Sequence, residues 1–318
     1  MRILQIGLGD FGMSWFQDVL IKNELITEFV LCDEDVTRLH TVEEFAHMHS
    51  IPCDVHLNLT EALETKPDYV LNVLPPHLHK ESTLICLEAG IPVLLEKPIA
   101  LNFEDAQEIY KVSRERKVPV IIAQNYRFTT VFRFVKEKID SGIIGNLQSM
   151  NIEFARMHSM GNYHKDLDEP LLLDVSIHHL DAIRYLVSEE CSICYGESYN
   201  PTWSHYKGNA NVNILLKSQS GVRVNYSGTL VNRFPKDNTG WIADWTIEGD
   251  RGRIIIENDK IYFQLADCEA VELDCGEKLD GRKALFDNFL LSMKLNQKAE
   301  TDISDNINTF QLAVDIMS

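Results

Sequence analysis

A repeated alternation of short apolar runs with helical stretches most restricts the folds open to this chain. It covers the first 123 of 318 residues. We expect strands near 2–6, 28–32, 54–58, 69–73, 92–95 and 119–123, with the clearest helices at 76–90 and 102–117. Such alternation is typical of βαβ units, which build a parallel sheet with helices on both faces. The sequence therefore predicts an α/β fold that begins with a doubly wound parallel sheet.

The pattern changes after residue 123. Strands in which apolar and polar residues alternate follow, for example at 222–226 and 261–265, with helices near 171–187, 282–295 and 305–317. This alternation indicates a sheet with one covered face. We predict two domains, an α/β domain at 1–123 and an α+β domain at 124–318. The second should contain a largely antiparallel open sheet.

Charge and cysteine content exclude several classes of partner. The chain has 30 basic and 48 acidic residues, a formal net charge of −18. This argues against nucleic acid or an anionic membrane as partner, although a small anionic substrate needs only one or two local cations. Seven scattered cysteines, including the C-x-x-C pair Cys191 and Cys194, predict inert thiols in a reducing compartment. Without a leader or a long apolar run, we expect a cytoplasmic protein.

A glycine motif follows the first strand directly, and an amphipathic helix follows the motif. The run Gly7-Leu8-Gly9-Asp10-Phe11-Gly12 fits G-x-G-x-x-G in the required position between strand and helix. Gly7 would permit a tight turn, Gly9 would let a pyrophosphate approach the backbone, and Gly12 would allow close helix packing. The N–H groups at the helix start would then hold the phosphates.

Asp33 ends the second strand, where a carboxylate would accept hydrogen bonds from the adenosine ribose. Glu34 and Asp35 add negative charge at the same corner, and Arg38 is the nearby cation. Such a corner should repel the 2′-phosphate of NADP, so NAD is the expected cofactor and NADP the less favoured one. The same acids also suit a helix N-cap, and both roles can hold together.

Polar residues follow three further strands at their carboxyl ends, where doubly wound sheets bind ligands. His77 and His79 follow the fourth strand; capping and cofactor contact suit them better than a metal, because no further ligand follows at helical spacing. Glu96 and Lys97 end the fifth strand just before Pro98, although a surface ion pair would look the same.

Tyr126 and Arg127 follow the sixth strand and should face the same crevice. Arg127 could equally brace the domain junction.

The expected helix 171–187 has a polar stripe on an otherwise apolar surface. At regular helical spacing Asp174, His178 and Asp181 fall on one face, at i, i+4 and i+7. Such a pair of oriented polar groups suits a positioned acid–base residue, and a solvated face with an Asp–His pair is the alternative. His179 lies about 100° around the helix and is expected to be a structural histidine.

Together these segments resemble the Gfo/Idh/MocA family, the group of glucose–fructose oxidoreductase and inositol 2-dehydrogenase. The resemblance runs over nearly the whole chain and rests on the order and spacing of several motifs. They are the glycine motif at 7–12, Asp33, Leu74-Pro75-Pro76-His77-Leu78-His79, Glu96-Lys97-Pro98, Asn125-Tyr126-Arg127-Phe128, Gly142-Ile143-Ile144-Gly145, Asp174-Val175-Ser176-Ile177-His178 and Trp245 to Gly252. The resemblance therefore implies a Rossmann dinucleotide-binding domain at 1–123 and an α+β domain at 124–318 that serves substrate binding and oligomerisation.

The resemblance also implies roles for individual residues. His178 would be the acid–base residue, Asp174 its neighbour, and Lys97 would reach both the nicotinamide and the substrate hydroxyl. The substrate side would be bordered by Tyr126 and Arg127. The cofactor side would comprise Gly7, Leu8, Gly9, Asp10, Phe11, Gly12, Asp33, Leu74, Pro75, His79, Glu96 and Lys97, with no metal ligand in the site.

The implied activity is NAD-dependent hydride transfer involving a secondary alcohol of a sugar, inositol or related polyol. The alternatives are a regulatory protein that senses NAD or a sugar, and an NAD-dependent glycosidase. Loops 156–165 and 233–241, and the approach to the Asp174 helix, match no substrate pattern. We also expect a homodimer or homotetramer formed by sheet-to-sheet packing, because Val222, Val224 and Tyr226 need cover.

Overall fold

A computed structural model describes residues 1–158 and 167–317 of the protein. The chain divides into two compact units. The first comprises Met1–Gln124 and Leu285–Ile307, and the second comprises Asn125–Ala284 and Asn308–Ser318. The segment 285–307 therefore packs with the first unit, although the sequence pattern assigns it to the second domain.

The first unit contains the predicted parallel sheet. Among the described residues it has six strands in the order β3-β2-β1-β4-β5-β6, and every pair is parallel. The strands are β1 (Arg2–Ile6), β2 (Glu28–Cys32), β3 (Cys53–His56), β4 (Tyr69–Asn72), β5 (Val93–Leu95) and β6 (Val120–Ile122). Their apolar runs are continuous because both faces of the sheet are covered. The doubly wound α/β fold is thus confirmed.

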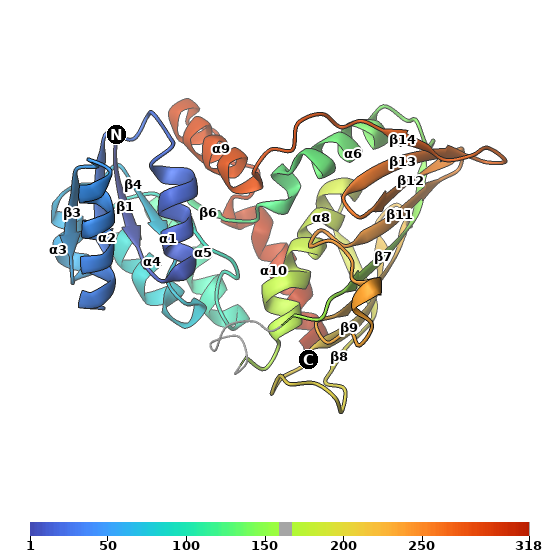
Figure 1. Ribbon diagram of the computed structural model, residues 1–318, viewed down its shortest axis with the longest axis horizontal. Helices are drawn as coiled ribbons and strands as arrows, with labels where there is room; N and C mark the ends of the chain where they lie inside the picture. Colours follow the sequence, from blue (N-terminus) through green and yellow to red (C-terminus); the bar gives the residue numbers. More distant parts are fainter. Residues whose placement is uncertain (159–166, 318) are drawn as a thin grey trace. The chain divides into compact units, whose positions relative to one another are not determined.

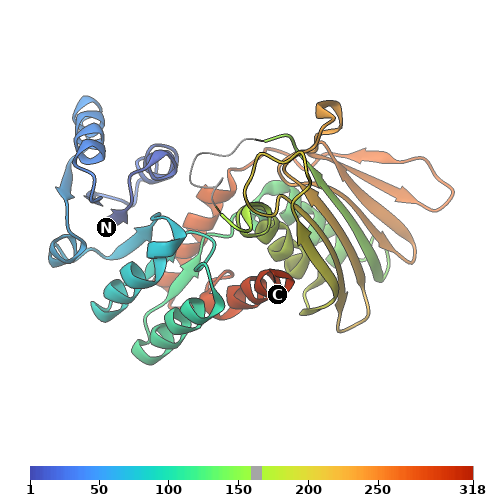
Figure 2. The same cartoon turned by 90° about the horizontal axis from the view of Figure 1, so that it is seen from below.

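Helices cover both faces of this sheet (Figure 2). They are α1 (Asp10–Trp15) with the π-helical turn η1 (Phe16–Leu20), α2 (Val36–Met48), α3 (Leu59–Glu64), the 3₁₀ turn η2 (Pro76–Leu78), α4 (His79–Glu88) and α5 (Phe103–Arg116). Side-chain caps fix several starts, as the Asn102 oxygen does by accepting from Asp105 N–H at 2.9 Å. From the C-terminal part, α9 (Gly281–Leu295) returns and packs the ring of Phe289 edge-on against Tyr69.

The second unit contains the predicted open sheet. Its described strands follow the order β14-β13-β12-β11-β7-β10-β9-β8, antiparallel except for the β7–β10 pair. They are β7 (Leu147–Ala155), β8 (Cys191–Tyr199), β9 (Asn211–Ser218), β10 (Arg223–Thr229), β11 (Asp244–Gly249), β12 (Gly252–Glu257), β13 (Lys260–Leu265) and β14 (Val271–Leu273). The helical segments are η3 (Tyr126–Phe128), α6 (Thr130–Asp140), η4 (Leu172–Ser176), α8 (Ile177–Val187), η5 (Pro235–Asp237) and α10 (Ile303–Met317), of which residues 303–307 belong to the first unit.

One face of this sheet is covered by helices of the same unit. Figure 1 shows α6 and α8 against it, and the Phe132 ring of α6 meets Trp245 of β11 at 5.2 Å. Val222, Val224 and Tyr226 point to this covered face and are buried. The expectation that these three residues need a second copy for cover is therefore wrong. Their neighbours Arg223 and Asn225 are exposed on the opposite face.

All seven cysteines are free thiols, with Cys194 exposed at an irregularity of β8. The described residues contain no group of three or more His, Cys, Asp and Glu side chains arranged to hold a metal ion. Within the same residues, no helix combines the length and the apolar character needed to cross a membrane.

Candidate active site

The glycine loop of the first unit has the geometry that its motif predicts. Gly7 has φ +95°, and a Cβ there would lie 2.8 Å from the carbonyl oxygen of Val73. A Cβ on Gly12 would lie 2.2 Å from the oxygen of Gly7, so the helix packs directly on the turn. A Cβ on Gly9 would meet nothing within 4 Å. The backbone at Gly9 therefore borders open space, which is what the approach of a pyrophosphate requires.

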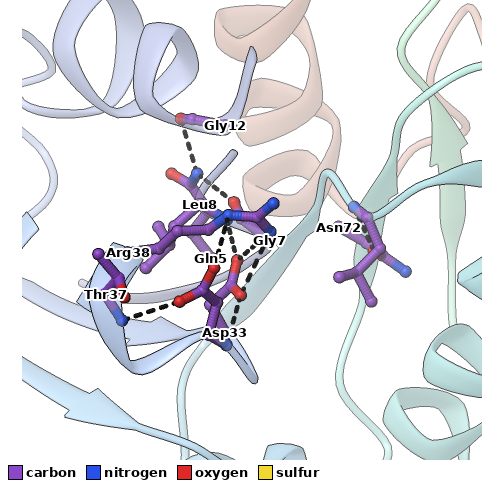
Figure 3. Close-up of polar contacts among 10 residues, drawn as sticks. Gln5, Gly7, Leu8, Gly12, Asp33, Thr37, Arg38 and Asn72 are labelled. Carbon is purple, nitrogen blue, oxygen red and sulfur yellow. Dashed lines mark hydrogen bonds and ion pairs between the residues drawn. The ribbon is translucent and has the colours of Figure 1, made fainter. Parts of the chain in front are cut away.

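The side chain of Gln5 fixes the glycine loop by hydrogen bonds, a role that the sequence analysis missed. Its side-chain amide donates to the carbonyl oxygens of Gly7 at 3.0 Å and of Gly12 at 2.8 Å (Figure 3). Both bonds are buried, so they fix the turn strongly. The available signal was a glutamine inside an otherwise apolar strand, because a buried amide must find partners.

Asp33 is buried at the end of β2 and also ties the loop together. Its carboxylate accepts from Leu8 N–H at 2.7 Å and from Asp35 N–H at 2.9 Å, while Arg38 Nη1 lies 3.5 Å from both oxygens (Figure 3). The Leu8 amide is thus used inside the protein. Asp35 caps α2 by accepting from Thr37 N–H, and this bond lowers the pKa of the Asp35 carboxyl. Of the two roles considered for these acids, the capping role is confirmed.

His79 joins two loops at the carboxyl ends of the strands. Its ring nitrogens lie 2.9 Å from the carbonyl oxygen of Pro98 and 2.7 Å from that of Leu74, and the ring is fully buried. Burial lowers the pKa of His79 to about 4, against the opposing effect of the carbonyls. A neutral imidazole carries only one N–H, so the ring donates to one of these two carbonyl oxygens. In the loop after β4, Leu74 is half-buried and Pro75 is exposed.

Glu96 is held by a tryptophan far away in the sequence. Trp15 Nε1 donates to Glu96 Oε1 at 2.7 Å, and Lys97 N–H donates to Glu96 Oε2 at 3.0 Å. The following Lys97–Pro98 peptide bond is cis. Lys97 itself is half-buried at the end of β5. Trp15 is a second residue that the sequence analysis missed.

These features fit a dinucleotide. The open space at Gly9, the tight packing at Gly7 and Gly12 and the carboxylate of Asp33 lie together in one unit, in the order that a dinucleotide needs. Asp10 and Phe11 form the first turn of α1, whose N-cap Gly9 lends no side-chain bond. The roles of individual cofactor residues remain predictions.

In the second unit, His178 lies beside Tyr126. Their rings stack face to face, with centroids 4.3 Å apart and planes at 11°. Burial raises the pKa of the Tyr126 hydroxyl, and the charge of Asp174 adds to this shift. Asp174, His178 and Tyr126 therefore form one cluster.

The helix that carries Asp174 and His178 differs from the expected regular helix. Asp174 lies in the π-helical turn η4, and His178 lies in the first turn of α8. Because a π-turn holds more residues per turn than an α-helix, the stripe expected for i, i+4 and i+7 is not regular here. π-Turns are frequent at functional sites.

Asp181, the third residue of the stripe, pairs with Arg127 and has a different role from Asp174 and His178. Arg127 donates from Nε to Asp181 Oδ2 at 2.8 Å and from Nη2 to Oδ1 at 2.6 Å, and both side chains are buried. Thr309 donates to the same carboxylate at 3.3 Å. The geometry favours the bracing role of Arg127, here inside the second unit, over contact with substrate.

His179 is a structural histidine, as predicted. One ring nitrogen lies 2.9 Å from the Tyr226 hydroxyl and the other lies 3.0 Å from the carbonyl oxygen of Trp241. The ring is fully buried, and burial lowers its pKa to about 4. Of loops 156–165 and 233–241, which match no substrate pattern, residues 159–165 lie outside the described part.

Two family models match the chain, one in each half. Residues 1–124 match the GFO_IDH_MocA model, described as an oxidoreductase family with an NAD-binding Rossmann fold. Residues 132–255 match the GFO/IDH/MocA C-terminal domain.

Similar curated proteins include y4oX of Sinorhizobium fredii, 25% identical over 82% of this chain and 74% of that protein. The myo-inositol 2-dehydrogenase of Thermotoga maritima is 27% identical over 60% of this chain and 56% of its own length. The D-glucoside 3-dehydrogenase of Escherichia coli is 25% identical over 59% and 54%. The matches to these two dehydrogenases thus span about half of their length.

Among solved structures, an oxidoreductase from Agrobacterium radiobacter in complex with NAD+, L-tartaric acid and magnesium has the same fold. The TM-score is 0.86 at 18% identity, covering 98% of this chain and 94% of that one. An oxidoreductase from Thermotoga maritima gives 0.81 at 20% identity, covering 100% and 97%. With matches to both of its domains, this chain belongs to the Gfo/Idh/MocA family of oxidoreductases.

Proposed function

We propose that the protein is an NAD-dependent dehydrogenase that acts on a secondary alcohol of a sugar, inositol or related polyol. The observation that carries this proposal is the cluster of His178, Tyr126 and Asp174, an acid–base group held in place by a stacked ring. The similarity to inositol and glucoside dehydrogenases supports the substrate class.

In the proposed reaction, the imidazole of His178 takes the proton of the substrate hydroxyl, and the carboxylate of Asp174 favours the protonated ring that results. Lys97 stabilises the developing negative charge on the oxygen. A bound nicotinamide supplies the hydride acceptor. Stacking on Tyr126 restricts the His178 ring to one plane, so the proton-accepting nitrogen keeps its direction.

We further propose NAD as the preferred cofactor. A 2′-phosphate at the ribose position would meet Asp33, with Glu34 and Asp35 beside it in sequence. Arg38 is a possible phosphate partner, but it already lies 3.5 Å from Asp33 and 3.6 Å from Asp35. Its charge is thus largely offset by these acids, which supports NAD over NADP.

We propose that the open face of the second sheet forms a homodimer. Across the strands, its side chains lie in three rows that follow the pairing register. One outer row, here called the basic row, contains Lys217, Arg223 and Arg253 together with one acid, Glu248. The other, here called the acidic row, contains Glu197, Glu153, Asp244 and Glu257 together with one base, Lys260. The middle row contains Tyr195, Leu215, Asn225, Asn151, Thr246, Ile255 and Tyr262.

The rows favour one orientation of a second copy. A two-fold axis parallel to the rows would set the basic row of each copy against the acidic row of the other. Crowding of like charges in the acidic row is already visible at Asp244, whose carboxyl pKa is raised by burial and then by Glu257 and Glu153. An opposing cationic row would relieve this repulsion.

The proposed activity is tested by following NADH absorbance over a panel of sugars, inositols and sugar acids, with NADP in parallel. At least one polyol should be oxidised, and Lys97→Ala should abolish most of the turnover. Lys111→Ala is the matched control, because Lys111 is exposed on α5 in an ion pair with Glu115 and has no proposed role in binding or chemistry. Binding of NAD without turnover of any substrate would favour a sensing protein instead.

A further inference from the structure

Two loops at one end of the second sheet are joined into a single rigid wall. Thr239 N–H donates to the carbonyl oxygen of Ala155 at 2.8 Å, and Ala155 N–H donates to Thr239 Oγ1 at 3.1 Å. Further along, Met157 N–H donates to Asn238 Oδ1 at 3.1 Å. Side chains on the described part of these loops, 155–158 and 238–241, therefore have defined positions.

Arg156 is fixed on this wall by two contacts. The centre of its guanidinium lies 4.6 Å above the ring of Trp241, and its Nη1 donates to the carbonyl oxygen of Thr239 at 2.5 Å. Its Nε is buried and has no acceptor within the described residues. Nor does any carboxylate in this part of the chain pair with Arg156, despite the net charge of −18.

In two other arginines of the second unit, the guanidinium edge formed by Nε and Nη2 binds a carboxylate. Arg127 uses Nε and Nη2 together on the carboxylate of Asp181, at 2.8 and 2.6 Å. Arg184 uses the same two nitrogens on Glu190, at 2.9 and 2.5 Å. This fork matches the two oxygens of a carboxylate or phosphate. Trp241 and Thr239 hold the guanidinium of Arg156 in place, but its Nε has no hydrogen-bond acceptor among the described residues.

The wall lies next to the proposed acid–base cluster. The carbonyl oxygen of Trp241 accepts from the ring of His179, the neighbour of His178 in sequence. Burial and the charge of Asp174 raise the pKa of Tyr126, and the charge of Arg156 opposes this rise. Arg156 therefore acts electrostatically on the ring that stacks on His178. Trp241 is 40% exposed and offers an aromatic face on which a sugar can stack.

We propose that the substrate is an acidic sugar or polyol, whose anionic group is bound by the Nε–Nη2 edge of Arg156 while its carbon skeleton lies near Trp241. The proposal rests on the proposed dehydrogenase function and narrows its substrate class. The proposal also explains how a protein with a net charge of −18 can bind an anion. One local cation is enough, and Arg156 is held in position by its hydrogen bond to the carbonyl oxygen of Thr239. A carboxylate and a phosphate share the required pair of oxygens.

The test compares matched substrates that differ only in charge. D-Glucuronate is paired with D-glucose, D-galacturonate with D-galactose, and glucose 6-phosphate with glucose. For each pair, kcat/KM is measured with NAD, and binding to the protein with NAD present is measured by calorimetry. We expect the preferred acid to exceed its neutral parent by at least about tenfold in affinity, the scale of one charge-assisted fork.

Variants then assign this preference to Arg156. Arg156→Met should lower kcat/KM for the acid by about 10², mainly through KM, and change the neutral parent by less than about threefold. Arg156→Lys should restore part of the loss, because it keeps the charge without the fork. Arg233→Met is the matched control, since Arg233 is exposed over Trp203 and should leave the preference unchanged. Melting temperatures confirm that each variant is folded.

The outcomes separate the two proposals. If every acid binds no more tightly than its neutral parent, or if Arg156→Met keeps the wild-type preference, the inference about Arg156 is wrong and the dehydrogenase proposal can still hold. If acids bind through Arg156 but no alcohol is oxidised, the dehydrogenase proposal fails and the anion site remains. A preference for glucose 6-phosphate over both uronates assigns the anionic group to a phosphate.

Discussion

The two units assemble their candidate sites in opposite ways. In the first unit, most candidate residues follow the end of a strand in chain order, so local motifs indicate them. In the second unit, each candidate depends on a partner far along the chain, as His178 depends on Tyr126 and Arg156 on Thr239. A motif can therefore predict a backbone turn, whereas long-range packing decides which polar side chain meets solvent and which is buried as a brace.

The largest effect should come from breaking a long-range brace in the second unit. Arg127→Met removes the partner of the buried Asp181, and an uncompensated buried carboxylate costs about 3–5 kcal/mol. Urea unfolding should show this loss, and Lys260→Met, at an exposed ion pair, should change stability by less than about 1 kcal/mol. Normal stability with a raised KM would instead place Arg127 in contact with substrate.

One buried histidine in each unit allows the units to be compared by pH. The pKa of His79 and of His179 is lowered to about 4, so each ring stays neutral in the folded state while the unfolded state takes up a proton below pH 6.5. Stability is thus complete above pH 6.5 and is lost as pH falls toward 4. Each ring should contribute about 1.4 kcal/mol per pH unit in this window.

The measurement is urea unfolding of the wild type, His79→Asn and His179→Asn at pH 7, 6, 5 and 4.5. Each variant is less stable at pH 7 but should lose stability less steeply on acidification. Parallel curves for the wild type and both variants would show that these histidines do not set the acid sensitivity.

The sequence predicted the fold well for a physical reason. Apolar strands such as β1 and β5 are buried on both faces, so their period and ends are visible without tertiary information. It could not predict that Gln5 and Trp15 support the first site, since their partners are set by packing. It also placed Val222, Val224 and Tyr226 on the open face, because alternation shows that one face is covered but not which one.

A smaller effect is expected at the cofactor corner of the first unit. The preference for NAD over NADP should be at least about tenfold and should narrow in Asp33→Ser, since the phosphate no longer meets a buried carboxylate. NAD affinity should fall as well, because Leu8 N–H loses its acceptor. Glu34→Gln is the control for charge alone and should narrow the ratio less. Equal titration of the wild type by both cofactors would contradict the assignment.

The smallest effect concerns the open face of the second unit. Light scattering at micromolar concentration should give a dimer or a tetramer that weakens as salt is raised from about 0.05 to 0.5 M, because exposed charges are screened. Arg223→Glu should weaken association, and adding Glu153→Lys should restore it. A monomer in the wild type at low salt would refute this interface.

The proposed mechanism is tested by a double-mutant cycle on kcat with the true substrate, using Lys97→Ala and His178→Ala. These residues lie in different units, and we propose that both act on one proton transfer. Each single variant should lose about 10² or more in kcat, with NAD affinity little changed in His178→Ala. The double variant should lose far less than the product of the two losses. A His178→Ala enzyme with near wild-type kcat would contradict the account.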